Sequence, residues 1–202
     1  MAPEMQRVIV ATGNRGKLDE IRSALDFPGW EFVTAADMGA ETLEVEETGD
    51  TFEENARLKA RAYHDVFGIA ALADDSGLQV DALDGVPGVY SSRYAGSDAT
   101  DADNNVKLLA ALAEVPESGR TARFRSVMVF VDVNGSETVA EGVCEGSIGV
   151  EAQGSGGFGY DPLFLPLAAP GRTMAELDRA DKNAISHRGA ALRALRECLD
   201  RI

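Results

Sequence analysis

The apolar residues of the chain form short continuous runs and helically spaced sets, which predict strands and helices respectively. The clearest run is FRSVMVFVDV at 124–133, and the dipeptide that follows it, Asn134-Gly135, is typical of a hairpin turn. Residues 139–150 are expected to return as the partner strand. Further strands are predicted over residues 7–11, 31–34, 69–73 and 78–83, the last two separated by the polar stretch 74–77.

Four sets of apolar residues at helical spacing predict the helices. The second helix is expected to begin after Thr51, since Glu54 three residues later completes the pattern of a capping box. The third is expected to start near Thr100, and the last to cover residues 186–199. Their apolar faces are Leu18, Ile21 and Leu25; Phe52, Ala56, Tyr63 and Val66/Phe67; Val106, Leu109 and Leu112/Ala113; and Leu192, Leu195 and Leu199.

Helices and strands are interspersed, but the middle of the chain has the pattern of a hairpin. We therefore expect an α/β protein of the mixed α+β kind, with a mixed sheet flanked by helices. The hydrophobic fraction is 45% of 202 residues, far above the range of disordered chains. Because no repeat or linker-like stretch interrupts the pattern, residues 1–202 are expected to form a single domain.

The chain is acidic, with a formal net charge of −15. A protein that binds nucleic-acid polymers needs a basic face, so this charge argues against such a partner and equally against anionic membranes. The N-terminal apolar run is too short for a signal peptide, and no apolar stretch is long enough to span a membrane. Two cysteines are too few for a disulfide framework, and the expected location is therefore cytoplasmic.

The turn between the first strand and the first helix has features of an anion site. It comprises residues 12–17 (TGNRGK), and a glycine-bearing turn at the start of a helix directs backbone N–H groups at an anion. Lys17 adds a full positive charge. The turn is not a Walker A loop, because Leu18 stands where Ser or Thr would bind magnesium. An ordinary turn with a solvated lysine is an equally good interpretation.

Two acidic segments are candidates for a metal site. Residues 41–54 hold seven acids and no base, and carboxylate oxygens are good ligands for Mg²⁺, although a solvated loop is the commoner meaning of such a run. Asp74 and Asp75 follow an apolar strand, where open α/β sheets place their sites. One of them could hold a metal ion or a water molecule while the other braces the turn. The alternative is a simple Asx turn between two hairpin strands.

Two later segments could contact a base or an anion. Residues 154–159 contain four glycines, which permit close backbone approach, and Phe158 and Tyr160 offer flat faces on which a base could stack. Alternatively, these aromatic residues anchor the loop to the core. Basic residues occur around the start of the last helix, where they oppose the helix dipole unless an anion or carbonyl binds nearby. Ser186 in the same segment could be only a helix cap.

Five ordered segments resemble the inosine triphosphate pyrophosphatase family. This resemblance implies an elongated mixed α/β fold with two lobes and a central cleft, usually as a homodimer. It also implies Mg²⁺-dependent hydrolysis of non-standard purine nucleoside triphosphates (dITP, ITP, XTP) to the monophosphate and pyrophosphate, which keeps them out of DNA and RNA. The segments are ATGNRGK (11–17), ETGDTFEENARLKA (47–60), ADDSGLQVDALDGVPGVYSSRY (73–94), GSGGFGYDPLF (154–164) and KNAISHRGAAL (182–192).

By matching position, the resemblance assigns roles to individual residues. Glu47 and Asp75 would bind Mg²⁺, with Asp75 also accepting the proton of the attacking water, while Lys17 would neutralise phosphate charge during catalysis. Ser76 would touch the substrate. The triphosphate would be held by Thr12, Gly13, Asn14, Arg15, Gly16 and Lys17, and the base and sugar would be surrounded by Phe158, Gly159, Tyr160, Asp161, Lys182, His187 and Arg188.

Two alternatives stay open at this point. The first is a related pyrophosphatase with another base preference, for example for modified pyrimidine nucleotides. The second is a nucleotide-binding regulator that does not hydrolyse its ligand. A panel of nucleotides separates the first alternative from a purine-specific enzyme, and tight binding of dITP without turnover would identify the second.

Overall fold

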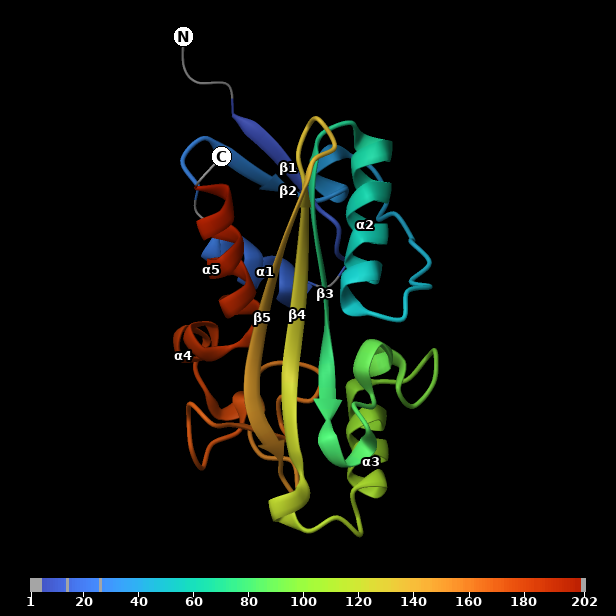
Figure 1. Ribbon diagram of the computed structural model, residues 1–202, viewed down its shortest axis with the longest axis vertical. Helices are drawn as coiled ribbons and strands as arrows, with labels where there is room; N and C mark the ends of the chain where they lie inside the picture. Colours follow the sequence, from blue (N-terminus) through green and yellow to red (C-terminus); the bar gives the residue numbers. More distant parts are fainter. Residues whose placement is uncertain (1–4, 14, 26, 201–202) are drawn as a thin grey trace. The chain divides into compact units, whose positions relative to one another are not determined.

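The computed structural model describes residues 5–13, 15–25 and 27–200, without the side chains of residues 15 and 16. The strands form one six-stranded sheet in the order β2-β1-β3-β4-β5-β6 (Figure 1). β1 pairs in parallel with β2 and β3, whereas β5 and β6 are antiparallel, which confirms the predicted mixed sheet. The strands are β1 (Gln6–Val10), β2 (Trp30–Val33), β3 (Ala70–Val80), β4 (Thr121–Val131), β5 (Glu137–Ile148) and β6 (Phe164–Pro166).

Five α-helices accompany the sheet in the described part of the chain. They are α1 (Arg15–Ala24), α2 (Phe52–Phe67), α3 (Asp101–Ala111), α4 (Arg179–Ile185) and α5 (His187–Leu199). The capping box predicted at Thr51 is confirmed at the start of α2. The predicted helix start near Thr100 is also confirmed, and Thr100 forms a second capping box there. Short 3₁₀ turns lie at Ala36–Met38, Asp81–Leu83, Gly88–Arg93, Glu117–Gly119 and Met174–Glu176. None of these helices is long and apolar enough to cross a membrane.

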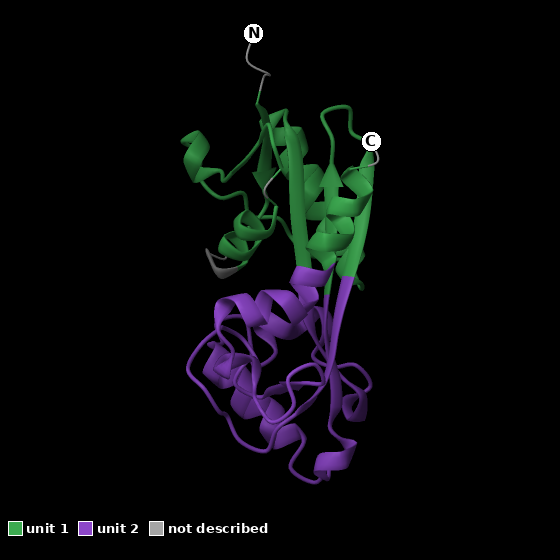
Figure 2. Cartoon of the chain, turned by 90° about the vertical axis from the view of Figure 1, so that its left-hand side faces the viewer, with its two compact units in different colours: residues 1–75, 126–141, 191–202 green, residues 76–125, 142–190 purple. Residues whose placement is uncertain are grey.

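The chain divides into two compact units, and each is built from separate segments of sequence (Figure 2). Unit 1 contains residues 1–75, 126–141 and 191–202, and unit 2 contains residues 76–125 and 142–190. Three strands, β3, β4 and β5, contribute residues to both units.

Unit 1 has a hydrophobic core on each face of its strands, because successive side chains of a strand point in opposite directions. Val8 and Val10 of β1 pack with α1 and α5, whereas Ile9 packs with α2 on the other face. β3 and β4 alternate in the same way. A strand that is buried on both faces needs apolar residues at every position, which explains the continuous apolar runs in the sequence.

A third hydrophobic cluster forms the core of unit 2. Leu108 of α3 and the C-cap residue Leu112 pack in it with residues of β3, β4, β5 and the segment 160–177. Gly146 on β5 is required here, because a Cβ atom at this position would lie 2.4 Å from the carbonyl oxygen of Leu165 and 2.6 Å from the Phe164 ring.

Two expectations for the middle of the chain are wrong. β3 is a single strand over Ala70–Val80, so residues 74–77 neither end a strand nor form a turn, and residues 81–83 form a 3₁₀ turn. The polar side chains are accommodated within the strand because they have polar partners, described below. Val66 and Val106 are 62% and 69% exposed and do not belong to the apolar faces of α2 and α3. The buried face of α3 contains Leu108, with Leu109 and the C-cap residue Leu112 packed in the same cluster. The short helix α4 was not expected.

Candidate active site

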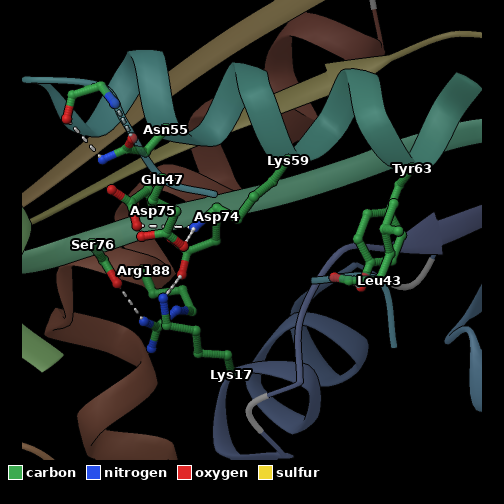
Figure 3. A network of polar contacts seen from close by, with 11 residues as sticks. Lys17, Leu43, Glu47, Asn55, Lys59, Tyr63, Asp74, Asp75, Ser76 and Arg188 are labelled. Atoms are coloured by element: carbon green, nitrogen blue, oxygen red, sulfur yellow. Dashed lines mark hydrogen bonds and ion pairs between the residues drawn. The ribbon is translucent and has the colours of Figure 1, made fainter. Parts of the chain in front are cut away.

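A lysine on α2 joins two of the predicted acidic residues (Figure 3). Lys59 Nζ lies 3.0 Å from Glu47 Oε1 and 2.9 Å from Asp75 Oδ1. Glu47 belongs to the acidic loop before α2, and Asp75 lies on β3. The ammonium group therefore holds carboxylates from two different segments of unit 1 in one cluster.

Burial changes the protonation behaviour of this cluster. Burial raises the pKa of the Asp75 carboxyl, and this effect exceeds the opposite effect of the Lys59 and Lys17 charges. Burial alone would lower the pKa of Lys59, but the negative charges of Asp75 and Glu47 raise it above its usual value. Asp75 is thus a carboxylate with increased proton affinity, and Lys59 remains charged.

The loop that carries Glu47 is fixed by hydrogen bonds to the first turns of α2. The buried Asn55 side chain accepts a hydrogen bond from the Gly49 N–H (2.8 Å) and donates to the Gly49 carbonyl (3.3 Å). A Cβ atom at Gly49 would lie 2.6 Å from Glu54 Cβ, so only glycine fits here. Asn55, Lys59 and Tyr63 are spaced by four residues and share one face of α2, where the Tyr63 hydroxyl donates to the Leu43 carbonyl (3.2 Å).

The neighbouring acid, Asp74, has different partners. Its Oδ2 atom lies 2.9 Å from Lys17 Nζ, and its Oδ1 atom accepts a hydrogen bond from the Ser126 hydroxyl (2.5 Å). The Asp74 side chain is fully buried, and Lys17 lies in the first turns of α1. Because adjacent residues of a strand point to opposite faces, Asp74 braces Lys17 while Asp75 faces Lys59.

The carboxylates of this cluster fit a magnesium ion. Asp75 Oδ2 is buried and has no hydrogen-bond partner among the described residues, and Glu47 is joined to Asp75 through Lys59. Mg²⁺ is usually bound by one or two carboxylates, with its other positions filled by water and substrate phosphates. No group of three or more His, Cys, Asp or Glu side chains suited to a metal lies within the described residues.

The remaining predicted residues of unit 1 lie where β1 leads into α1. Thr12 is partly buried and Gly13 is exposed. Arg15 and Gly16 begin α1, but their side chains are not described, and Asn14 lies outside the described residues.

In unit 2, two predicted basic residues lie close to the ring of Phe158. Lys182 Nζ lies 4.6 Å from the ring centroid and the guanidinium carbon of Arg188 lies 5.6 Å from it, both within range for cation–π attraction. Asp161 Oδ2 is 2.8 Å from Lys182 Nζ and accepts a hydrogen bond from the Phe158 N–H (2.9 Å). Arg188 is almost completely buried and donates to the Ser76 hydroxyl (2.9 Å).

Two other predicted residues of unit 2 have contacts that stabilise the fold. The buried Tyr160 hydroxyl donates to the Ser91 carbonyl (2.8 Å), and its ring packs in the core of unit 2, so Tyr160 anchors the glycine-rich loop. Burial also raises the pKa of this phenol. The His187 ring stacks on Phe124 with centroids 4.8 Å apart. Ser186 accepts a hydrogen bond from the Gly189 N–H (3.0 Å), which confirms its interpretation as a helix cap.

The model of the Ham1 family matches residues 8–198. This chain belongs to the Ham1 family. Among its Ham1 relatives, the dITP/XTP pyrophosphatase of Shigella flexneri is 50% identical over 199 residues, covering 96% of this chain and 98% of the relative. The dITP/XTP pyrophosphatase of Desulforamulus reducens is also 50% identical, over 196 residues that cover 97% and 96% of the two chains. These matches confirm the family resemblance of the five sequence segments.

Solved structures of Ham1 proteins confirm the fold class. A HAM1 protein from Coxiella burnetii is 43% identical and superposes with a TM-score of 0.88, covering 98% of this chain and all of that structure. A nucleoside-triphosphatase/dITP/XTP pyrophosphatase from Mycobacterium abscessus is 46% identical, with a TM-score of 0.77 and coverage of 94% and 98%.

We expect the substitution Asp161→Leu to lower the free energy of unfolding by about 3 kcal/mol, because it removes the carboxylate partner of the buried Lys182. Adding Lys182→Met should recover most of this loss, since an apolar pair replaces the ion pair. Urea unfolding followed by circular dichroism measures both variants. A double variant as unstable as Asp161→Leu alone would show that the ion pair is not the cause.

Proposed function

We propose that this Ham1 protein hydrolyses non-standard purine nucleoside triphosphates, dITP/ITP and XTP, to the monophosphate and pyrophosphate, and so limits their incorporation into DNA and RNA. The observation that carries the proposal is the identity of about half of all residues to dITP/XTP pyrophosphatases over 96% of the chain. The cluster of Glu47, Lys59 and Asp75 supports the proposal. The Oδ2 atom of Asp75 has no hydrogen-bond partner among the described residues, while Lys59 holds the Asp75 carboxylate next to Glu47.

In the proposed reaction, Lys17 and the N-terminus of α1 attract the triphosphate, since both present positive charge. The Asp74 carboxylate, held by Ser126, fixes the Lys17 ammonium group. Glu47 and Asp75 would hold Mg²⁺, which supplies neutralisation of phosphate charge when bound. Asp75 would also accept the proton of the attacking water, as the family resemblance implies.

Base recognition is assigned to the residues around Phe158 in unit 2. The ring face of Phe158 suits stacking with a purine. The Arg188 guanidinium can donate to the 6-oxo group of hypoxanthine or xanthine, whereas the 6-amino group of adenine would leave two donors facing each other. A site that relies on such hydrogen bonds discriminates strongly, because the wrong base leaves buried groups without partners.

The proposal extends to the setting in which the enzyme acts. We propose a cytoplasmic homodimer in which residues 1–202 act as one domain, without a nucleic-acid polymer or a membrane as partner. The family resemblance supports the dimer. The net charge of −15 supports the absence of polyanionic partners, because a polyanion is repelled much more strongly than a single nucleotide whose charge is reduced by Mg²⁺.

A substrate panel with separate detection of pyrophosphate and orthophosphate tests the proposed reaction. With Mg²⁺ present, dITP, ITP and XTP should release pyrophosphate with kcat/KM at least about 100-fold above that for dATP. A preference for modified pyrimidine nucleotides would favour the related pyrophosphatase. Orthophosphate without pyrophosphate would contradict the proposed bond cleavage.

Asp75→Asn should lower kcat for dITP at least about 100-fold, because the amide cannot accept the proton of the attacking water. Nucleotide binding and the unfolding transition should change little. Glu46→Gln is the matched control, since this exposed acid lies beside Glu47 in the acidic loop. Near-normal turnover by Asp75→Asn would remove Asp75 as the base. Tight binding without turnover by the wild-type protein would instead identify a regulator.

Glu47→Gln should raise the Mg²⁺ concentration required for half-maximal activity about tenfold, because a neutral amide is a weaker ligand for a hard cation. The Glu46→Gln control should leave the Mg²⁺ titration unchanged, and a chelator should abolish activity in all variants. An identical Mg²⁺ dependence in Glu47→Gln and wild type would exclude Glu47 as a ligand.

A further inference from the structure

The backbone of Gly159 is held on both sides by side chains of α3. The Gly159 N–H donates to Asp101 Oδ2 (2.6 Å), and Asn105 Nδ2 donates to the Gly159 carbonyl (3.0 Å). These contacts join residues 58 and 54 positions apart in sequence, all within unit 2. We refer to Asp101 and Asn105 as the α3 clamp.

The α3 clamp sits on a firmly anchored helix. Asp101 and Asn105 are four residues apart and therefore lie on the same face of α3. Between them, Asn104 accepts a hydrogen bond from the Ala95 N–H (2.7 Å) and donates to the Ser92 carbonyl (3.2 Å). The capping box at Thr100 fixes the start of the helix. The clamp thus connects the glycine-rich loop to a helix that is itself packed in the core of unit 2.

The loop needs such support because of its own conformation. Gly157 and Gly159 both have positive φ angles, 74° and 62°, and they flank Phe158 directly. Glycine has more backbone freedom than other residues, so this stretch would sample many conformations without external contacts. The peptide before Phe158 is held by Asp161, and the peptide after it is held by Asp101. Together these bonds restrain the backbone on both sides of Phe158, whose ring lies within cation–π range of Lys182 and Arg188.

We propose that Asp101 and Asn105 are positioning residues that set affinity and selectivity for the purine by fixing Phe158. This inference rests on the proposed function, in which the Phe158 ring contacts the base. A loop that is ordered before binding loses less entropy when the nucleotide arrives, so affinity is higher. A fixed ring also keeps the base in register with Arg188, on which discrimination against adenine depends.

The test compares nucleotide kinetics of Asp101→Ala, Asn105→Ala and the double variant with wild type. The double variant should raise KM for dITP about tenfold while kcat changes less than about threefold, and the preference for dITP over dATP should fall about tenfold. Asp101→Asn keeps an acceptor oxygen and should restore most of the effect of Asp101→Ala. Val106→Ala, on the exposed part of the same helix, is the matched control.

Hydrogen exchange of residues 157–161 tests the clamp without any nucleotide. Exchange should be at least about tenfold faster in the double variant than in wild type or Val106→Ala, because the loop opens more often. A folded double variant with wild-type exchange, KM and selectivity would overturn the inference, as would a loss of kcat alone. If the wild-type protein hydrolysed no nucleotide, the proposed function would be wrong. Hydrogen exchange alone would then test the α3 clamp, and exchange in the double variant equal to that in wild type would reject it.

Discussion

The arrangement of this protein depends on one constraint, which is that β3 carries polar residues through a buried strand. A buried carboxylate is costly unless it is paired and hydrogen-bonded. Asp74 therefore requires Lys17 and Ser126, and Asp75 requires Lys59. These partners determine where the start of α1 and the inner face of α2 lie in unit 1. In unit 2, the next residue of the strand, Ser76, accepts a hydrogen bond from the buried Arg188. The polar side chains of β3 thus bring their partner side chains together, in unit 1 around Asp74 and Asp75 and in unit 2 around Ser76.

Lys59 links the buried carboxylate of Asp75 to the second acid of the candidate site, Glu47. One ammonium group contacts both carboxylates of the cluster of Glu47, Lys59 and Asp75, and the buried Oδ2 atom of Asp75 has no hydrogen-bond partner among the described residues. Such a cluster can fold before a cation arrives, because Lys59 removes most of the repulsion between the two acids. Under the proposed function, the Asp75 oxygen that has no hydrogen-bond partner would contribute to binding the metal ion. The same residues would then serve both the stability of the fold and metal binding.

Much of the fold was predictable because the signals are local. The capping boxes at Thr51 and Thr100, the hairpin at residues 132–136 and the doubly buried strands follow from neighbouring residues. The continuity of β3 was not predictable, because the partners that permit it are distant in sequence; Ser76 and Arg188 are 112 positions apart. The Asp75–Lys59 pair was missed for a related reason. A lysine on an amphipathic helix is usually solvated, and only its spacing from Asn55 and Tyr63 on one buried face could have marked it.

The division into two units bears on how the chain folds during synthesis. The ribosome releases the N-terminus first, and domains generally fold in that order. Unit 1, however, includes Leu192 and Leu195 of α5 in the same core as β1 and α1. The earliest segments must therefore wait for the last ones, whereas unit 2 has all its segments once residue 190 has emerged. The first strands to leave the ribosome therefore gain their last core partners only after residue 195 has emerged.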